Sequence, residues 1–254
     1  MNINDVGLKV LGWVKKMKGN AVDLDKLTAM NTPTMEHHNW TALLKKHVTA
    51  AGQVNYKGFI QDSTLLQAYL DDLSTHPPGN NWTEEEKIAY WINAYNAFTV
   101  KLIVDHYPLK SIKDIGDGLP MINSPWDIKF FKIGNIDFDL NTIEHEILRK
   151  EFTEPRIHFA INCASFSCPK LRNEAYFASK LEEQLEEQTL GFINNPQKNI
   201  INETETELSK IFDWFQSDFI KKSSLFDFLN RYTASLNEAN KVTYVEYDWA
   251  LNEK

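Results

Sequence analysis

A chain of 254 residues with 43% hydrophobic and 24% charged residues has the composition of an ordinary globular protein, which excludes extensive disorder. Its formal net charge of -8 argues against nucleic acid as a partner, because affinity for phosphate backbones depends on clustered lysine and arginine. No apolar run is long enough to span a bilayer, so we expect no membrane partner. The first residues lack a signal-peptide pattern, which predicts a cytoplasmic protein if this N-terminus is native and an exported one if a signal was removed.

Helical patterns dominate the first part of the chain. Apolar residues recur at helical spacing in three ranges, which are 6–18, 34–48 and 62–73. The strongest helix signal begins at Thr83, which forms a capping-box pattern with Glu86 in a first turn rich in glutamate. Large apolar residues follow at helical spacing, so we expect this helix to continue to about His106.

The middle of the chain changes character. Two short segments rich in aromatic and β-branched residues, 129–133 and 136–138, flank Gly134-Asn135, which predicts a β-hairpin. A short helix is expected from Asn141 through Arg149. The range 156–162 alternates apolar and polar residues, which predicts a strand.

The last part of the chain is predicted to return to helices. Ser179 and Glu182 repeat the capping-box pattern and predict another helix. Two more helices are expected around 209–220 and 225–233. Residues 242–249 are expected to be extended and packed, because their aromatic side chains are costly to expose.

These elements predict an α+β fold with a mainly helical shell around a small antiparallel sheet. The sheet would combine the hairpin, the strand at 156–162 and the C-terminal segment. We expect residues 1–50 to form an N-terminal helical extension and residues 51–254 to form a single domain.

The short helix at 141–149 carries a carboxylate in an unfavourable place. Glu144 falls within the apolar arc that includes Ile143 and Ile147, and His145 lies at the flank of that arc. A carboxylate on a buried face is expensive unless it is paired or hydrogen-bonded. We therefore expect this helix to direct Glu144 and His145 toward the interior or the edge of a cleft.

The predicted strand supplies the partners that this carboxylate needs. Its polar face would carry Arg156, His158 and Asn162, and its other face would enter the core. Glu144 and His145 are the nearest polar residues in sequence that could meet them. The five other histidines stand in polar or helix-end settings and are interpreted as surface or capping residues; they are His37, His38, His47, His76 and His106.

Cys163 follows the strand, and three interpretations of the stretch remain open. In the first, Cys163 is a nucleophile with His145 or His158 as its base, oriented by Glu144 or Asn96. In the second, a metal is bound by two thiols and two imidazoles, those of Cys163, Cys168, His145 and His158. The C-x4-C spacing of the two cysteines is, however, wider than in a zinc knuckle. In the third, the polar residues form a buried network that only fixes the fold. A small-loop disulfide between Cys163 and Cys168 is possible, and reduced thiols in a cytoplasm fit the sequence as well.

Two asparagines on the long helix add a further candidate. Asn93 and Asn96 share a stripe beside its aromatic residues, and asparagine is favourable within a helix only where its amide is used. Their amides would either bind the backbone of a neighbouring loop or contribute to a site.

Four motifs together resemble the family catalogued as domain of unknown function 547. They occur in the family's order between about residues 56 and 252; they are Trp91-Ile92-Asn93-Ala94-Tyr95-Asn96-Ala97, Ile143-Glu144-His145-Glu146-Ile147-Leu148-Arg149, Arg156-Ile157-His158-Phe159-Ala160 with Cys163 and Ser167-Cys168-Pro169, and Tyr247-Asp248-Trp249-Ala250-Leu251-Asn252. The resemblance implies no established activity. Bacterial members often stand alone, and eukaryotic members carry the domain beside others such as DEP or glutaredoxin domains.

The resemblance also bears on individual residues. Some plant members lack counterparts of His145, His158 or Cys168, which counts against a metal site, whereas the thiol matching Cys163 persists more widely. This chain has Ala164 where a glycine is common. The order of elements also loosely resembles papain-like and transglutaminase-like thiol hydrolases.

The function expected from the sequence is that of a thiol-dependent hydrolase or transferase acting on a small molecule or peptide, without metal or cofactor. Cys163 would be the nucleophile, His145 the base with His158 as its alternative, and Glu144 the group that orients the imidazole. Substrate would be bound by four polar residues, which are Asn93, Asn96, Arg156 and Asn162, with Asn96 or Asn162 near the developing oxyanion. The alternative is a non-catalytic binding or interaction module in which the same polar cluster is structural.

Overall fold

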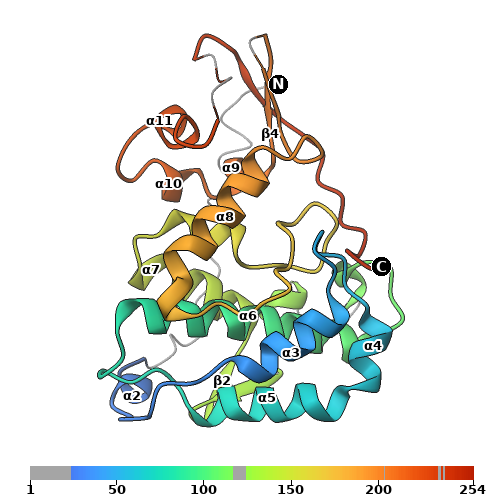
Figure 1. Ribbon diagram of the computed structural model, residues 1–254, viewed down its shortest axis with the longest axis vertical. Coiled ribbons are helices and arrows are strands. Elements are labelled where there is room, and N and C mark those ends of the chain that lie inside the picture. Colours follow the sequence, from blue (N-terminus) through green and yellow to red (C-terminus); the bar gives the residue numbers. More distant parts are fainter. Residues whose placement is uncertain (1–23, 117–123, 203, 234–235, 237) are drawn as a thin grey trace.

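One long helix, α6 (Glu84–His106), crosses the lower half of the molecule, and the C-terminal helices lie above it (Figure 1). The computed structural model describes residues 24–116, 124–202, 204–233, 236 and 238–254, so the helix predicted over 6–18 lies outside the described residues. The helices that precede α6 are α2 (Leu24–Thr28), α3 (His38–His47), α4 (Tyr56–Gln61) and α5 (Ser63–Thr75).

Helix α6 begins as the sequence predicts. The hydroxyl of Thr83 accepts the N–H of Glu86, and the Glu86 carboxylate accepts the N–H of Thr83. Fifteen of its residues, from Ile88 to Ile103, are buried. A helix covered on nearly all sides serves as the axis of the core, and this burial explains why its polar residues need internal partners.

The predicted hairpin is confirmed. Strands β1 (Phe131–Ile133) and β2 (Ile136–Phe138) pair antiparallel, with Phe131 opposite Phe138. Gly134 and Asn135 both have positive φ, of 57° and 67°, which is the backbone conformation of a tight hairpin turn. Two short 3-10 helices, η1 (Ile112–Asp114) and η2 (Pro125–Asp127), lie between α6 and the hairpin in sequence.

The segment after the hairpin forms short helices joined by loops and contains no strand up to residue 163, so the strand predicted over 156–162 is wrong. A π-helix, η3 (Thr142–Leu148), continues into α7 (Arg149–Glu151), and a 3-10 helix, η4 (Pro155–Phe159), follows. Pro155 fixes a helical φ at the first position of η4, and the Glu154 side chain accepts the N–H of Arg156. Residues 157, 158 and 159 are all buried, which the alternation of a strand would not allow.

The C-terminal part forms a second group of short elements. They are η5 (Ala178–Lys180), α8 (Leu181–Ile193), β3 (Ile200–Ile201), β4 (Thr206–Leu208), α9 (Ile211–Trp214), α10 (Gln216–Phe219), α11 (Leu225–Leu229) and β5 (Val242–Tyr244). The capping box predicted at Ser179 and Glu182 is wrong, because α8 begins after Lys180 without a side-chain cap. None of the described helices is both long and apolar enough to cross a membrane.

The α+β class is confirmed, but the strands are distributed differently from the prediction. The hairpin stands alone as a two-stranded sheet, and a separate sheet has the order β3-β4-β5, with β5 parallel to β4. The predicted single sheet fails because 155–159 is helical and because the C-terminal strand pairs with β4.

Two hydrophobic clusters make up the core. The larger surrounds α6 and includes Leu27, Trp40 and Leu44 from the predicted N-terminal extension. The smaller gathers phenylalanines of α8 to α11 around Phe159. Because Phe159 lies in η4 beside Ile157 and Ala160 of the larger cluster, this short helix joins the two.

The C-terminal residues connect distant parts of the chain. Their backbone N–H groups bond to three separate carbonyls: Leu251 to Lys110, Asn252 to Ala164, and Lys254 to Val54. The Asn252 side chain also accepts the hydroxyl of Tyr56 and donates to the side chain of Asn162.

Candidate functional site

Glu144 lies on the π-helix η3 and points into the molecule, as the sequence predicts. It is 7% exposed, and its Oε2 accepts a hydrogen bond of 3.2 Å from the hydroxyl of Tyr95 on α6. Burial, followed by the charge of Glu144, raises the pKa of Tyr95 well above its usual value. Tyr95 therefore keeps its proton and offers the buried carboxylate a donor.

Asp218 on α10 is the centre of a neighbouring cluster, here called the Asp218 cluster, made of His145, Arg149, His158 and Asp218. Its Oδ2 accepts the Nε–H of Arg149 at 2.6 Å and the Nε2–H of His158 at 2.9 Å, and Arg149 Nη1 donates to His145 Nδ1 at 2.8 Å. Burial acts to raise the pKa of Asp218, but the hydrogen bonds from His158 and Arg149 outweigh it and hold this pKa well below its usual range. Asp218 is thus a charged partner for His158 and for Arg149, and Arg149 in turn holds His145.

His158 is enclosed by this cluster. Its ring stacks on Phe215 at 4.1 Å between centroids, and burial lowers its pKa below the ordinary value. Its Nδ1 has no hydrogen-bond partner among the described residues. A cavity of about 10 Å³ lined by His158, Asp218 and Lys221 lies next to it, which is room for about one water molecule.

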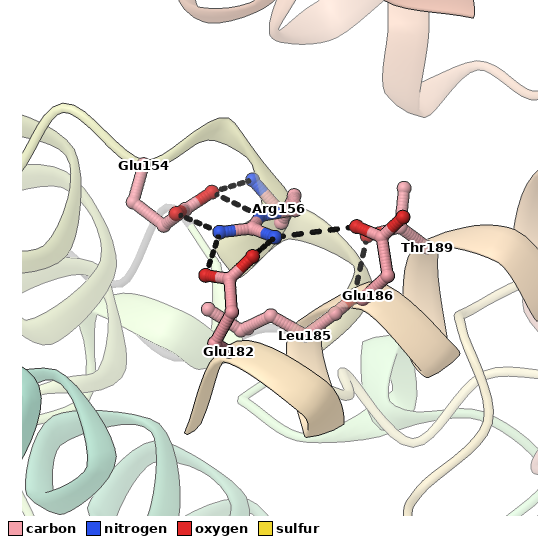
Figure 2. Close-up of polar contacts among 6 residues, drawn as sticks. All are labelled: Glu154, Arg156, Glu182, Leu185, Glu186 and Thr189. Carbon is pink, nitrogen blue, oxygen red and sulfur yellow. Dashed lines mark hydrogen bonds and ion pairs between the residues drawn. The ribbon is translucent and has the colours of Figure 1, made fainter. Parts of the chain in front are cut away.

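Arg156 does not point to a substrate cleft but joins two elements (Figure 2). It bonds to both carboxylate oxygens of Glu154 on its own segment, to both of Glu182 on α8 and to Glu186 one turn further along. The hydrogen bonds that this guanidinium donates to Glu154, and then those to Glu182, raise its pKa further. The arrangement attaches η4 to α8.

The asparagines predicted for substrate binding hold backbone groups. Asn93 bonds to both the N–H and the carbonyl of Tyr176, and Asn96 bonds to the carbonyl of Ala160 and the N–H of Asn162. The side chain of Asn162 in turn donates to the carbonyl of Pro169. Each of these amides is engaged at both its oxygen and its nitrogen.

Cys163 and Cys168 form a disulfide, here called the sulfur pair, with their Cα atoms 6.3 Å apart. The hydroxyls of Ser165 and Tyr247 each lie 3.4 Å from Cys163 Sγ. No imidazole is within hydrogen-bonding distance of this sulfur among the described residues. The structure therefore brings His145 and His158 together with Asp218 rather than with Cys163.

Two tyrosines lie between the carboxylate and the sulfur pair. Burial, and to a lesser degree the charge of Glu144, raises the pKa of Tyr247, whose hydroxyl reaches both sulfurs. Tyr95, bonded to Glu144, also interacts electrostatically with Tyr247. Glu144 and Cys163 thus belong to one region but do not touch.

The sequence did not predict the role of Asp218 or the burial of two histidines. Asp218 is 60 residues from His158 and stands in a helix of four residues, so no local spacing indicated it. Two of the histidines interpreted as surface or capping residues are buried: His37 is bonded to Tyr69 at 2.8 Å and His47 to Asp62 at 2.6 Å.

The residues considered as metal ligands are not gathered in one place. The disulfide uses both sulfurs, and the two imidazoles face Arg149 and Asp218. Within the described ranges, no group of three or more His, Cys, Asp and Glu side chains is arranged to hold a metal ion.

Comparison with known proteins bears on the region that contains the site. Searches of curated proteins and of solved structures found no match. A family model described as "Protein of unknown function, DUF547" matches residues 79–193, which include α6, the hairpin, η3, η4, the sulfur pair and α8. The C-terminal motif at 247–252 lies outside that match. The resemblance seen in the sequence motifs is therefore confirmed over residues 79–193, which match the DUF547 family model.

Proposed function

We propose that this chain acts by thiol–disulfide exchange at the sulfur pair. The observation that carries the proposal is the set of donors around Cys168 Sγ: the N–H of Cys163 at 3.0 Å, the hydroxyl of Tyr247 at 3.2 Å and the hydroxyl of Ser165 at 3.3 Å. Hydrogen bonds donated to a sulfur stabilise its thiolate and lower the pKa of the thiol. A thiol of lower pKa leaves faster when its disulfide is attacked.

The exposure of the two cysteines sets the direction of attack. Cys163 is partly exposed, whereas Cys168 is 4% exposed. An incoming thiolate therefore attacks Cys163 Sγ and forms a mixed disulfide with it. The bond between Cys163 and Cys168 breaks, and its electron pair leaves on Cys168.

A second substrate thiolate completes the exchange. It attacks the substrate sulfur of the mixed disulfide, and Cys163 leaves as a thiolate. Two substrate thiols are thereby oxidised to one disulfide, while Cys163 and Cys168 are reduced and take up the two protons that the substrate thiols released. The reverse sequence of steps would reduce a substrate disulfide.

Ser165 and Tyr247 each have one hydroxyl proton, which each can donate to Cys168 once this sulfur carries the charge of the leaving group. In the disulfide state the hydroxyls of Ser165 and Tyr247 also lie 3.1 Å from one another, so they share several weak acceptors. A thiolate on Cys168 is a far stronger acceptor than a disulfide sulfur and would attract both protons. Burial raises the pKa of Tyr247, which keeps it in the protonated, donating form.

Thiol-dependent hydrolysis or transfer, as expected from the sequence, needs a base at Cys163. The imidazoles of His145 and His158 are engaged with Arg149 and Asp218 instead. Exchange is therefore the thiol chemistry that these contacts support best, because it needs no base on the protein once the incoming group is a thiolate.

The test measures how fast dithiothreitol reduces the disulfide in the folded protein, with samples quenched by iodoacetamide and analysed by mass spectrometry. Ser165→Ala and Tyr247→Phe should each slow the reduction by about tenfold, since each removes one hydrogen bond to a charged sulfur. Tyr244→Phe is the control, because the Tyr244 ring on β5 lies near Lys210. Reduction of the double variant at the wild-type rate would contradict the proposal.

A non-catalytic interaction module is the second candidate, and one observation favours it. The predicted polar site residues bind other protein groups: Arg156 bonds to α8, His158 to Asp218, His145 to Arg149, and the asparagines to the backbone of loops. A disulfide that dithiothreitol reduces only in denaturant would favour this module over exchange.

A further inference from the structure

Four aromatic side chains form a connected surface, here called the aromatic patch, that reaches the sulfur pair. Ring centroids are 5.7 Å apart for Trp126 and Trp249, 5.9 Å for Trp249 and Trp214, and 4.8 Å for Trp214 and Tyr247. The patch ends at Tyr247, whose hydroxyl contacts both sulfurs.

The patch is open to solvent at the point where a substrate would arrive. Trp214 is 46% exposed, and Phe166, within the disulfide loop, is 47% exposed. The backbone of Phe166 adjoins the segment that carries Trp249, because its N–H bonds to the carbonyl of Ala250. Large aromatic groups are costly to leave in water, and clustered ones commonly mark a binding surface.

Cations accompany these rings. The ammonium of Lys113 lies 3.8 Å from the centre of the Trp249 ring, and that of Lys198 lies 4.5 Å from the centre of the Phe166 ring. Lys113 is exposed, whereas Lys198 is buried and donates to the backbone carbonyl of Phe166. At the edge of the patch, Lys113 therefore offers positive charge to a partner.

We infer that the aromatic patch is the docking surface for an extended polypeptide whose cysteine is flanked by an aromatic and an acidic residue. This inference rests on the proposed exchange function and names its substrate class. The substrate's aromatic side chain packs on Trp214, its carboxylate meets Lys113, and its thiolate reaches Cys163 past Tyr247. A small neutral thiol would use none of these contacts.

The test compares two amide-capped tetrapeptides, Glu-Trp-Gly-Cys and Gln-Ala-Gly-Cys, as reductants of the folded, oxidised protein. Each rate is divided by the same peptide's rate with hydroxyethyl disulfide, which removes differences in thiol reactivity. The peptide with Trp and Glu should have a normalised rate about tenfold higher. Its advantage should decrease with added salt, because part of it is electrostatic.

Variants test whether the higher normalised rate of the peptide with Trp and Glu depends on the aromatic patch. Trp214→Ala should reduce the ratio of the two normalised rates severalfold, and Lys113→Gln should remove its salt dependence. Leu65→Ala is the matched control, because Leu65 is an exposed apolar residue, 58% exposed, on α5 and outside the patch; it should leave the ratio unchanged.

The outcomes separate this inference from the function on which it rests. Equal normalised rates for the two peptides, with dithiothreitol still reducing the disulfide, would overturn the docking surface and leave exchange standing. A folded protein that neither dithiothreitol nor the peptides reduce would refute exchange, and the docking inference with it.

Discussion

Asn96 illustrates how a polar side chain inside a helix can serve the backbone of another segment. Its amide is 2% exposed, and it satisfies the carbonyl of Ala160 and the N–H of Asn162 just before the sulfur pair. Buried backbone groups without partners are costly, so this single residue determines the path of the chain into Cys163.

Replacing this amide should destabilise the protein. Asn96→Leu keeps the volume but leaves two buried backbone groups unpaired, and we expect the free energy of unfolding to fall by about 3 kcal/mol. Urea denaturation followed by circular dichroism measures the change. Gln67→Ala removes an exposed amide on α5 and should cost less than about 0.5 kcal/mol; equal losses for the two variants would contradict the assignment.

His37 predicts a pH dependence of stability. Burial, followed by the charge of His38, lowers the pKa of His37 from 6.5 to about 4. His37 becomes protonated near pH 6.5 in the unfolded chain but only near pH 4 in the native protein. The free energy of unfolding therefore falls as the pH decreases from 6.5 to 4. The loss from this residue is about 3 kcal/mol, and it is complete near pH 4.

The measurement is the urea midpoint of unfolding at several pH values in that window. His37→Phe keeps an aromatic ring beside those of Tyr69, Tyr90 and Phe177 and cannot titrate. It should show a shallower decrease in stability between pH 6.5 and 4. A variant with the wild-type slope would show that other groups dominate.

The residues of the candidate site were only partly predictable, and the reason is their separation in sequence. Glu144 could be placed inward because its neighbours follow a helical period, and burial with a bond to Tyr95 confirms that placement. Asp218 and Tyr247 meet the site through tertiary contacts across 60 and 84 residues, which no local pattern records.

Among the helices and strands, the prediction from the sequence agrees with the structure where several local signals coincide. At α6 the capping box, the acidic first turn and the apolar period all agree, and the helix begins where predicted. At Ser179 only the capping spacing was present, and no box forms. At Arg156 the alternation resembled a strand, but Pro155 and the Glu154 cap determined a 3-10 turn.

The start of α6 allows a matched comparison of two glutamates in one turn. Glu86 accepts the N–H of Thr83, whereas Glu85 has no part in the capping box. Thr83→Ala and Glu86→Ala should each lower the free energy of unfolding by about 1 kcal/mol, and Glu85→Ala by only about 0.3 kcal/mol through the helix dipole. Thermal unfolding followed by circular dichroism distinguishes them; a larger loss for Glu85→Ala would contradict the capping account.

The whole molecule combines two hydrophobic clusters through one short helix. Phe159 contacts the rings of Phe192, Phe212 and Phe219 in the smaller cluster, while the residues around it in sequence belong to the larger. The sequence indicated that many aromatic residues would be buried, but not that they divide in this way. That division follows from where η4 lies, which was the element predicted wrongly.

Phe159→Ala should therefore loosen one part of the protein more than the other. We expect a loss of about 4 kcal/mol in stability and faster hydrogen exchange at α11 than at α6, measured by mass spectrometry of peptic peptides. Leu66→Ala, in the larger cluster, should show the opposite preference. Equal acceleration at both helices in both variants would indicate a single cooperative unit.

The bonds from residues 251–254 to Val54, Lys110 and Ala164 have a consequence for how a newly made chain reaches this structure. Synthesis proceeds from the N-terminus, so these three carbonyls emerge from the ribosome long before the N–H groups that satisfy them. Until residues 251–254 have emerged, those carbonyls must bond to water or to another partner, so these native contacts form late in the synthesis of this part of the chain.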